Sequence, residues 1–413
     1  MALILSKSPY HIGRKDLVPN ASLKVTIGVF EFDFAGNNSF RALDTYDFAY
    51  RNKTHIDISQ VVHDTQDTYY TFLTSTNSYF AQDFSNNSLI VETQLSGFKD
   101  VNGVLTATTY AETFQALRGY VYSSDIYNYD ATPDLAKNSY YAGSSDIVYK
   151  LDDSNLELPF VNPTSSDNPY ENLNYDTYVV VNAFNKGELI DSKYLYFSGG
   201  AVYQKYTTNH FASFTERINS EGAELEQNKC LTDFFDCHRI ADIDKITISS
   251  SDNTPIKTLE VRTVEEKKYN PYRLSFKNRF GVWENLWFFK KSTEQIKVSR
   301  SEFRANQFQA RVNARELNIG YNDTPVVRQS QQYNTNGITE LTLNSGFVDE
   351  SLNESFKQLL LSEEVVLYNF NEGSYEAVTV TNTDLEFKTS TNDKLINYEI
   401  KVKMANNMID DIT

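Results

Sequence analysis

Residues 271–289 carry the pattern that decides the fold class, and they read PYRLSFKNRFGVWENLWFF. Aromatic and apolar residues dominate on both sides of a central glycine, Gly281. Side chains of this kind suit the pleated surface of a β-sheet, whereas glycine suits the turn between two strands. The stretch therefore predicts strands over residues 272–280 and 286–289, joined through residues 281–284.

Two tryptophans of this stretch, Trp283 and Trp287, stand four positions apart. An exposed pair of this kind can form a platform on which a sugar ring stacks. The neighbouring residues Leu286, Phe288 and Phe289 are apolar, however, and a large aromatic among them gains most by burial. The pattern favours a core position for both tryptophans.

The composition of the whole chain is that of a β protein. Its 413 residues include 28 Tyr and 27 Phe, and the polar residues are rich in Asn, Ser and Thr. We therefore predict a mainly β fold of β-sandwich or barrel-like domains, with a minor α+β part. The length exceeds what one small core needs, which predicts two domains, residues 1–240 and 241–413.

The first domain begins with a predicted strand over residues 24–34. Its apolar alternation changes phase near Gly28, which indicates either a bulge at Gly28 or a strand buried on both faces. Residues 85–122 alternate more weakly, and we predict a short helix at their end, over residues 109–118. Ser198-Gly199-Gly200 lies between two apolar runs and predicts a hairpin.

Residues 123–175 interrupt this pattern. Ser, Asp, Asn, Tyr and Pro dominate there, with little periodicity. A long stretch without a pattern is typical of a partner-binding loop, and its aromatic residues argue against disorder. We predict an arm that becomes ordered against a neighbouring subunit.

The second domain opens with a predicted hairpin, residues 245–250 and 256–264, and contains one clear helix near residues 349–364. Ser351 and Glu354 have the spacing of a capping box at its start. Four short strands are expected after the helix, and the last one has one buried face. The apolar residues behind these predictions are Leu352, Phe356, Leu359 and Leu360 in the helix, and Ile396, Tyr398, Ile400 and Val402 in the last strand.

Five segments carry a resemblance to a known group of proteins. They are Leu5-Ser6-Lys7-Ser8-Pro9-Tyr10, residues 271–289, Ser345-Gly346-Phe347-Val348-Asp349-Glu350-Ser351-Leu352, residues 356–364 and residues 392–400. Together they resemble tail and neck structural proteins of crAss-like short-tailed bacteriophages of Bacteroides and its relatives. The match covers roughly the last 145 residues and the start of the chain.

The resemblance implies a virion protein that is made and assembled in the cytoplasm of the bacterial host. It implies part of the tail hub or barrel ring through which the genome is ejected, in contact with other tail and neck proteins. Closed rings on the order of six or twelve copies are expected, because repeated heterologous contacts end when a ring closes. It implies no catalysis and no cofactor.

The charge of the chain fits passage of DNA better than binding of DNA. The net charge is −17, with 38 Lys+Arg against 55 Asp+Glu. Phosphate binding needs clustered cations, so an acidic surface argues against a protein that grips DNA. A conduit with acidic walls would let DNA pass without specific binding. No run approaches the roughly 18 apolar residues of a membrane span, and the apolar start is too short for a signal peptide.

The sequence offers only weak candidates for metal binding or catalysis. Cys230, Cys237 and His238 lie close together, but a fourth zinc ligand is lacking, and two free thiols are the default in a reducing cytosol. Paired acids for glycoside hydrolysis are expected by chance among 55 acidic residues. The acidic groups concerned are Asp152, Asp153 and Glu157, and Asp125, Asp130 and Asp134. We therefore expect no catalytic residues, no metal and no cofactor.

One segment, residues 260–328, reverses the global charge. It holds 14 Lys+Arg against 8 Asp+Glu, counted along the sequence, and aromatic residues are interleaved with them. Such a segment can form a groove for nucleic acid. It can also form an interface with the acidic half of a neighbouring subunit, which we favour. The predicted subunit-contact residues are Tyr127, Tyr129, Tyr140 and Tyr141 in the arm, and Arg300, Arg304 and Arg311 in the basic segment.

The alternative function is a carbohydrate- or receptor-binding attachment module of the virion. The abundant Tyr and Asn residues and the two tryptophans favour it. A glycan array separates the two functions, since a tail ring should bind no glycan selectively.

Overall fold

The computed structural model confirms a mainly β fold. It describes residues 2–13, 17, 22–32, 38–49, 55–69, 88–123, 141, 143–151, 158–159, 178–196, 214–216, 226–229, 243–250, 254–264, 268–281, 283–304, 308–313, 316–321, 330–382 and 395–406. The strands form three large sheets and three two-stranded pairs, all among these residues. No helix of the described residues is long and apolar enough to cross a membrane.

The first sheet is built from the N-terminal part of the chain. Its order is β1 (Ala2–Leu5), β7 (Val104–Leu117), β6 (Ser88–Val101), β3 (Ser22–Phe32) and β4 (Asn38–Ala49). Helix α1 (Ser59–Tyr69) places Val62 in the same core as Leu23, Val25 and Ile27 of β3. Strands β2 (His11–Gly13) and β5 (His55–Asp57) pair beside it.

Two of the predictions for this sheet can be compared with the structure. The pairing of β3 with β4 shifts register between Ile27 and Gly28, which confirms the predicted bulge. The short helix predicted over residues 109–118 is wrong, because these residues continue β7, which pairs with β6 along its whole length. Long-range strand pairing overrides the helix-forming composition of this stretch.

The second sheet has the order β10 (Glu188–Tyr196), β9 (Tyr178–Asn185), β13 (Lys245–Ser250), β14 (Pro255–Val264) and β8 (Ile147–Leu151). The predicted hairpin of β13 and β14 is confirmed. Because β8 and β9 precede residue 240 and β13 and β14 follow it, the domain boundary expected near residue 240 would divide this sheet. The hairpin predicted around Ser198-Gly199-Gly200 lies largely outside the described residues. Two short strands, β11 (Phe214–Glu216) and β12 (Glu226–Lys229), pair separately.

The third sheet contains most of the C-terminal part of the chain. Its order is β16 (Trp283–Phe288), β15 (Tyr272–Lys277), β21 (Val365–Asn369), β22 (Ser374–Val380), β23 (Leu395–Met404), β20 (Ser330–Asp349) and β17 (Thr293–Arg304). The backbone N–H of Lys290, just after β16, donates to the carbonyl of Asn344 on β20 at 3.1 Å. This hydrogen bond brings the end of β16, the first strand in the sheet order, close to β20, the sixth.

One apolar core joins the C-terminal strands and helices. It combines β15 and β16, the start of the helical region, helix α3 (Asn353–Leu361) and β23. The contributing side chains are Leu274, Phe276, Leu286, Phe288, Leu341, Leu343, Val348, Leu352, Phe356, Leu359, Val365, Leu367, Val378, Ile396, Tyr398, Ile400 and Val402. The predicted helix is thereby confirmed, as is the single buried face of β23. Three strands, β21, β22 and β23, follow the helix; a fourth before residue 389 would lie outside the described residues.

The helical region begins at a cap other than the predicted one. The carboxylate of Asp349 accepts from the backbone N–H of Ser351 at 3.0 Å and caps the 3₁₀ helix η6 (Glu350–Leu352), which leads into α3. The capping box predicted from Ser351 and Glu354 is therefore wrong. An Asp at the N-cap accepts from a backbone N–H of the first turn, which has no partner within the helix. It thus replaces the hydrogen bond that the capping box would have supplied.

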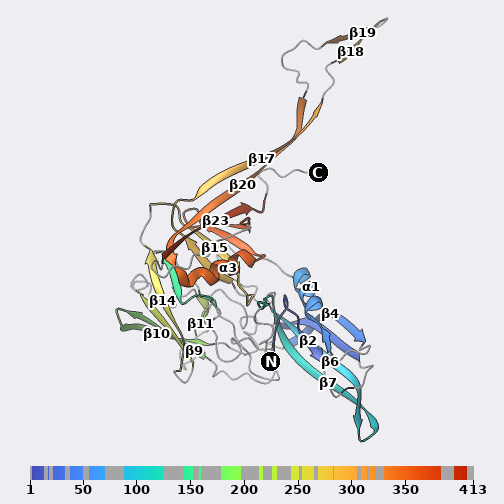
Figure 1. Ribbon diagram of the computed structural model, residues 1–413, viewed down its shortest axis with the longest axis vertical. Helices are drawn as coiled ribbons and strands as arrows, with labels where there is room; N and C mark the ends of the chain where they lie inside the picture. The colour runs from blue at the N-terminus through green and yellow to red at the C-terminus, as the bar shows by residue number, and fades with distance from the viewer. Residues whose placement is uncertain are drawn as a thin grey trace.

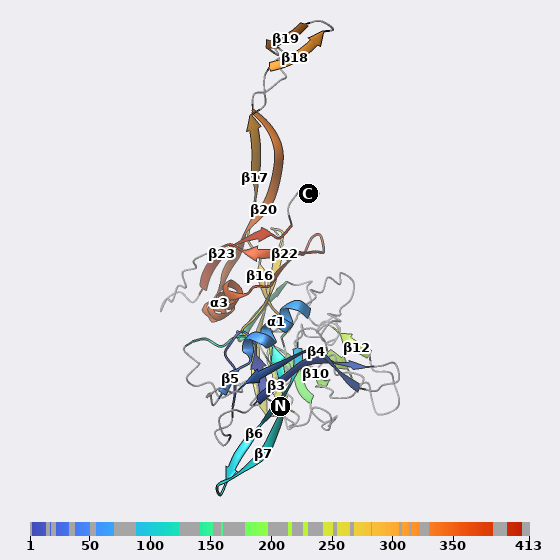
Figure 2. The same ribbon diagram turned by 90° about the vertical axis from the view of Figure 1, so that its right-hand side faces the viewer.

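The molecule is elongated, with a projection at each end (Figure 1). Strands β17 and β20 leave the body together as a long ribbon, and β18 (Phe308–Asn313) and β19 (Glu316–Tyr321) pair beyond its far end. The hairpin of β6 and β7 projects from the opposite end (Figure 2). The core therefore lies between two extended β structures.

Candidate assembly surfaces

The predicted contact residues are found in different environments. Tyr127, Tyr129 and Tyr140 lie outside the described residues. Tyr141 is buried, with 6% of its surface exposed, and its hydroxyl donates to the carbonyl of Ser145 at 3.4 Å. An interior side chain cannot meet a neighbouring subunit, so Tyr141 belongs to the fold of its own chain.

The three predicted arginines lie on strands β17 and β18 of the long projection. Arg300 and Arg304 are exposed on β17, and Arg311 lies on β18, where the structure describes the backbone. The structure thus brings Arg300 and Arg304 onto one strand. This strand is half of the ribbon, which we define as residues 293–304 of β17 and residues 330–342 of β20.

The ribbon is held together mainly by its own cross-strand contacts. Lys297 pairs with Glu340 on β20 at 2.6 Å, and the rings of Phe303 and Tyr333 lie 6.1 Å apart. Ser330 and Gln332 donate to the carboxylate of Glu302, and these hydrogen bonds hold its pKa below the ordinary value.

Apolar side chains of the ribbon are exposed to solvent. The exposed fraction is 51% for Ile296, 49% for Val298 and 68% for Tyr333. Valine and isoleucine stabilise a strand chiefly by packing, which these positions lack within the described part of the chain. This exposure makes the ribbon a candidate contact surface.

A second candidate surface is the tip of the β6–β7 hairpin. Asn102 and Gly103 form its turn with φ values of 57° and 82°, and the N–H of Gly103 donates to Asp100 at 2.7 Å. An Asn-Gly pair favours this type of tight turn. Four apolar side chains around the turn are exposed: Phe98, Val101, Val104 and Leu105. The Asn-Gly dipeptide between alternating residues is the sequence signal for this hairpin, which was not predicted.

The N-terminal sheet carries the hairpin projection and the C-terminal sheet carries the ribbon. The two sheets meet at a joint that is rich in ion pairs. Arg118, just after β7, pairs with Glu363 at 3.3 Å and with Glu364 at 2.9 Å, after the end of α3. Lys7 pairs with Glu363 at 2.7 Å, and Lys277 on β15 pairs with Glu364 at 3.0 Å. Burial lowers the pKa of Lys277 to about 8, although Glu364 opposes this shift.

Backbone contacts make the joint close-packed. The N–H of Tyr120 donates to the carbonyl of Arg279 at 2.7 Å, and the N–H of Lys7 donates to the carbonyl of Gly119 at 2.9 Å. A Cβ added at Gly119 would lie 2.5 Å from the carbonyl oxygen of Arg279. Only glycine permits this approach of the two segments. The start of the chain therefore takes part in the joint.

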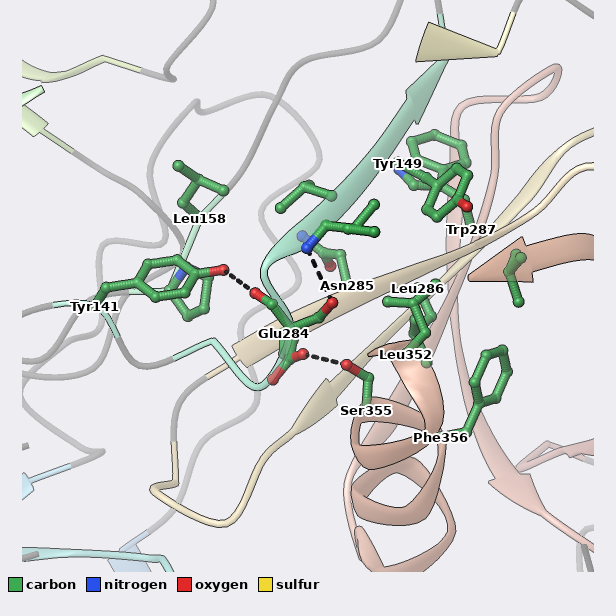
Figure 3. A pocket seen from close by; sticks show the side chains of 15 residues that line it. Tyr141, Tyr149, Leu158, Glu284, Asn285, Leu286, Trp287, Leu352, Ser355 and Phe356 are labelled. Carbon is green, nitrogen blue, oxygen red and sulfur yellow. Dashed lines mark hydrogen bonds between the residues drawn. The ribbon is translucent and has the colours of Figure 1, made fainter. Parts of the chain in front are cut away.

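A pocket between α3, β16 and residues 141–149 is the other site with chemical potential (Figure 3). The carboxylate of Glu284 accepts from the hydroxyl of Ser355 at 2.9 Å, from the side-chain amide of Asn278 at 3.1 Å, and from the backbone N–H and hydroxyl of Ser144. Burial raises the pKa of Glu284, although these hydrogen bonds oppose the shift.

The described residues that line the pocket include a single carboxyl group. Glycoside hydrolysis uses two carboxyl groups that flank the bond. Glu284 is the one acidic residue among the described residues that line the pocket. Its hydrogen bonds tie the segment around Ser144 to the C-terminal core, which is a structural role. The acids Asp152, Asp153, Glu157, Asp125, Asp130 and Asp134 lie outside the described residues.

The tryptophans are confirmed as core residues. Trp283 and Trp287 are each 6% exposed, and the ring of Trp287 stacks with that of Phe289 at 6.1 Å. The guanidinium of Arg273 lies 5.7 Å from the Trp287 ring. Neither ring forms an open platform for a sugar. Within the described residues no group of three or more metal-ligating side chains occurs, and Cys230, Cys237 and His238 lie outside them.

Comparison with protein-family models and with curated proteins gives no match to this chain. Function must therefore be inferred from the residues and geometry of the chain itself.

Proposed function

We propose that this chain is a structural subunit of a bacteriophage tail or neck. It forms part of a closed tail-hub or barrel ring through which DNA leaves the virion, and it performs no catalysis. The ring contacts other tail and neck proteins and lets DNA pass without specific binding. Its location is then the virion, after assembly in the host cytoplasm.

The observation that carries this proposal is the ribbon of β17 and β20, which leaves the body with apolar side chains exposed. An isolated pair of strands is at best marginally stable in water, so a long ribbon gains stability from a neighbouring molecule. The hairpin tip offers a further surface at the opposite end of the body. Contact surfaces at both ends suit a subunit with neighbours in an assembly. The resemblance of the C-terminal segments to phage tail proteins points the same way.

The test is negative-stain electron microscopy of the full chain at micromolar concentration, with the mass determined by light scattering. Closed rings are expected. Their mass gives the copy number, for which on the order of six or twelve is expected from the resemblance. A particle that stays monomeric alone and with its neighbouring virion proteins would contradict the proposal.

DNA passage has its own measurement. Because the net charge is −17, the assembled protein should show no retention of duplex DNA in a filter-binding assay at physiological salt. Tight, salt-sensitive DNA binding would contradict the conduit.

The alternative proposal is a carbohydrate- or receptor-binding attachment module. Burial of both tryptophans removes the stacking platform that first favoured it. The exposed apolar tip of the β6–β7 hairpin is the feature that still supports a receptor contact. Selective signals on a glycan array, lost on replacement of Phe98 and Leu105 by serine, would favour this function over the ring.

A further inference from the structure

We propose that the ribbons of neighbouring copies pair edge to edge, strand β17 of one copy with strand β20 of the next. The paired ribbons then close into one antiparallel β-barrel. This inference rests on the proposed ring and names the surface and the partner, a second copy of this chain.

The ribbon has two long edges with no further strand among the described residues. Strand β17 is the last strand of its sheet. Strand β20 pairs with β23 only from Glu340 to Asp349, so residues 330–339 have β17 as their one described strand partner. At about 3.4 Å per residue, β17 spans roughly 40 Å and residues 330–339 of β20 span roughly 34 Å. Edges of this length are templates for pairing with another chain, and proteins normally cover them.

The two faces of the ribbon carry different side chains. Ile296 lies opposite Thr339 and Val298 opposite Gly337, on the face that continues from the core residue Leu341. The other face carries Gln295, Lys297, Ser299 and Ser301. The core-facing side of the sheet thus continues beyond the body without a covering layer in the described structure. Side-by-side ribbons would join these half-exposed apolar side chains into one continuous surface.

The number and direction of the ribbon edges also suit a ring. A subunit of a cyclic ring has two neighbours and meets them through two different surfaces. The ribbon has two different edges, one formed by β17 and the other by β20. Because β17 runs away from the body and β20 runs back, these edges meet as antiparallel strands between copies that share one orientation. Closure into a barrel removes every edge.

Charge also favours contact at the ribbon. The chain carries a net charge of −17, so copies repel one another in general. The ribbon holds equal numbers of acidic and basic residues. They are Glu294, Glu302 and Glu340, and Lys297, Arg300 and Arg304. The ribbon is therefore a place where copies can approach without net repulsion.

The test uses the full chain with one spin label in the ribbon. Cys230 and Cys237 are changed to serine, and Ser299→Cys carries a nitroxide. Equivalent residues of adjacent ribbons are two strand spacings apart, about 10 Å, so the electron paramagnetic resonance spectrum should show dipolar broadening. Mixing with an excess of unlabelled protein should remove it. The matched control is Glu372→Cys, at an exposed turn of the body between β21 and β22, which should show no broadening.

Two deletion variants distinguish the contribution of the ribbon to association from that of the segment beyond its far end. Replacing residues 305–329 by Asn-Gly keeps every pair of the ribbon, because Arg304 and Ser330 are partners. Replacing residues 296–339 by Asn-Gly removes the ribbon and keeps the pair of Gln295 with Glu340. The first protein should associate as the full chain does, and the second should be monomeric. Unchanged tryptophan fluorescence shows that the body of each is folded.

The outcomes distinguish the ribbon contact from the ring itself. Rings that show no broadening and survive loss of the ribbon would overturn edge pairing and leave the tail ring standing. Broadening in open pairs or chains that never close would support edge pairing and count against the ring. A full chain that remains monomeric up to on the order of 100 µM overturns edge pairing, since this contact needs no other protein.

Discussion

At the scale of single residues, Glu284 determines how the arm joins the C-terminal core. It lies in β16, yet it accepts hydrogen bonds from Ser144, from Asn278 and from Ser355 on α3. Three parts of the chain far apart in sequence therefore depend on one buried carboxylate. A buried charged group is tolerated when it is fully hydrogen-bonded, and its loss leaves the donors unpaired.

Glu284→Ala should lower the free energy of unfolding by about 3 kcal/mol, because it leaves a cavity and several buried donors without an acceptor. Glu284→Gln keeps the shape and one acceptor oxygen and should cost about 1 kcal/mol. Urea unfolding followed by tryptophan fluorescence measures both, since Trp283 and Trp287 are the only two tryptophans. An alanine variant as stable as the glutamine variant would contradict the role of the carboxylate.

The contribution of Glu284 to stability depends on pH, because burial raises the pKa of its carboxyl group. The folded state holds the proton of Glu284 at pH values where the unfolded state has released it. The stability that protonation contributes is therefore complete below the ordinary glutamate pKa, and it is lost as pH rises toward the raised value. The stability difference between the original chain and Glu284→Gln should change across this window and be constant below it.

At the scale of elements, the Asp349 cap connects the long strand β20 to the helical region. Burial would raise the pKa of Asp349, but the hydrogen bond from Ser351 and the charge of Arg262 outweigh it and hold the pKa below the ordinary value. The contribution of this carboxylate is thus present above the ordinary aspartate pKa and is lost as pH falls through the lowered one.

Asp349→Ala should reduce the free energy of unfolding by about 1–2 kcal/mol at neutral pH. Asp349→Asn, which keeps an acceptor for the Ser351 N–H, should lose less. The neighbouring Glu350→Ala serves as the control for loss of an acid in the same turn. Chemical denaturation at neutral and acidic pH measures all three, and a loss for Asp349→Ala that does not shrink in acid would contradict the charged cap.

Local patterns predicted the last strand and the strands on both sides of Gly281, because alternation and aromatic content act over a few residues. The predicted connection over residues 281–284 was too long, since β16 already begins at Trp283. The bulge at Gly28 was readable for the same reason. The continuation of β7 through Phe114 was not, since helix-forming residues there are held by β6. The sheet that crosses residue 240 depends on the parallel pairing of β8 with β14, more than 100 residues apart in sequence.

For the candidate sites, too, local patterns could be read from the sequence and long-range contacts could not. The prediction that Arg300 and Arg304 contact a neighbouring subunit stays a prediction; both lie exposed on the ribbon. Composition could not show that Tyr141 is turned into the core, because an aromatic residue suits both an interface and an interior. The ribbon itself was not predicted. Its length depends on register between strands that are separated by the whole segment of residues 305–329.

At the scale of the whole molecule, the joint at Arg118 sets how firmly the two ends are connected. Its guanidinium is largely buried, with 13% of the side chain exposed, and it contacts two glutamates that follow α3. A partly buried ion pair broken on one side leaves an uncompensated charge, which is costly. By contrast, the pair of Lys297 with Glu340 is exposed on the lysine side, at 61%.

Arg118→Ala should lower the stability by about 3 kcal/mol and separate the melting of the two halves into two calorimetric transitions. Lys297→Ala should change the stability by less than about 1 kcal/mol and leave one transition. Differential scanning calorimetry of both variants at matched ionic strength measures the difference. Equal effects of the two substitutions would show that the joint contributes no more than a surface pair.

The projections at opposite ends of the body also govern how a single copy moves in solution. Friction depends on the extent of a particle as well as on its mass, and the ribbon and the β6–β7 hairpin lengthen this molecule in opposite directions. A monomer of 47.3 kDa should therefore elute from a gel-filtration column ahead of compact standards of the same mass. Its apparent size would imitate that of a dimer. Sedimentation velocity, which separates shape from mass, should return a frictional ratio well above that of a sphere for one copy.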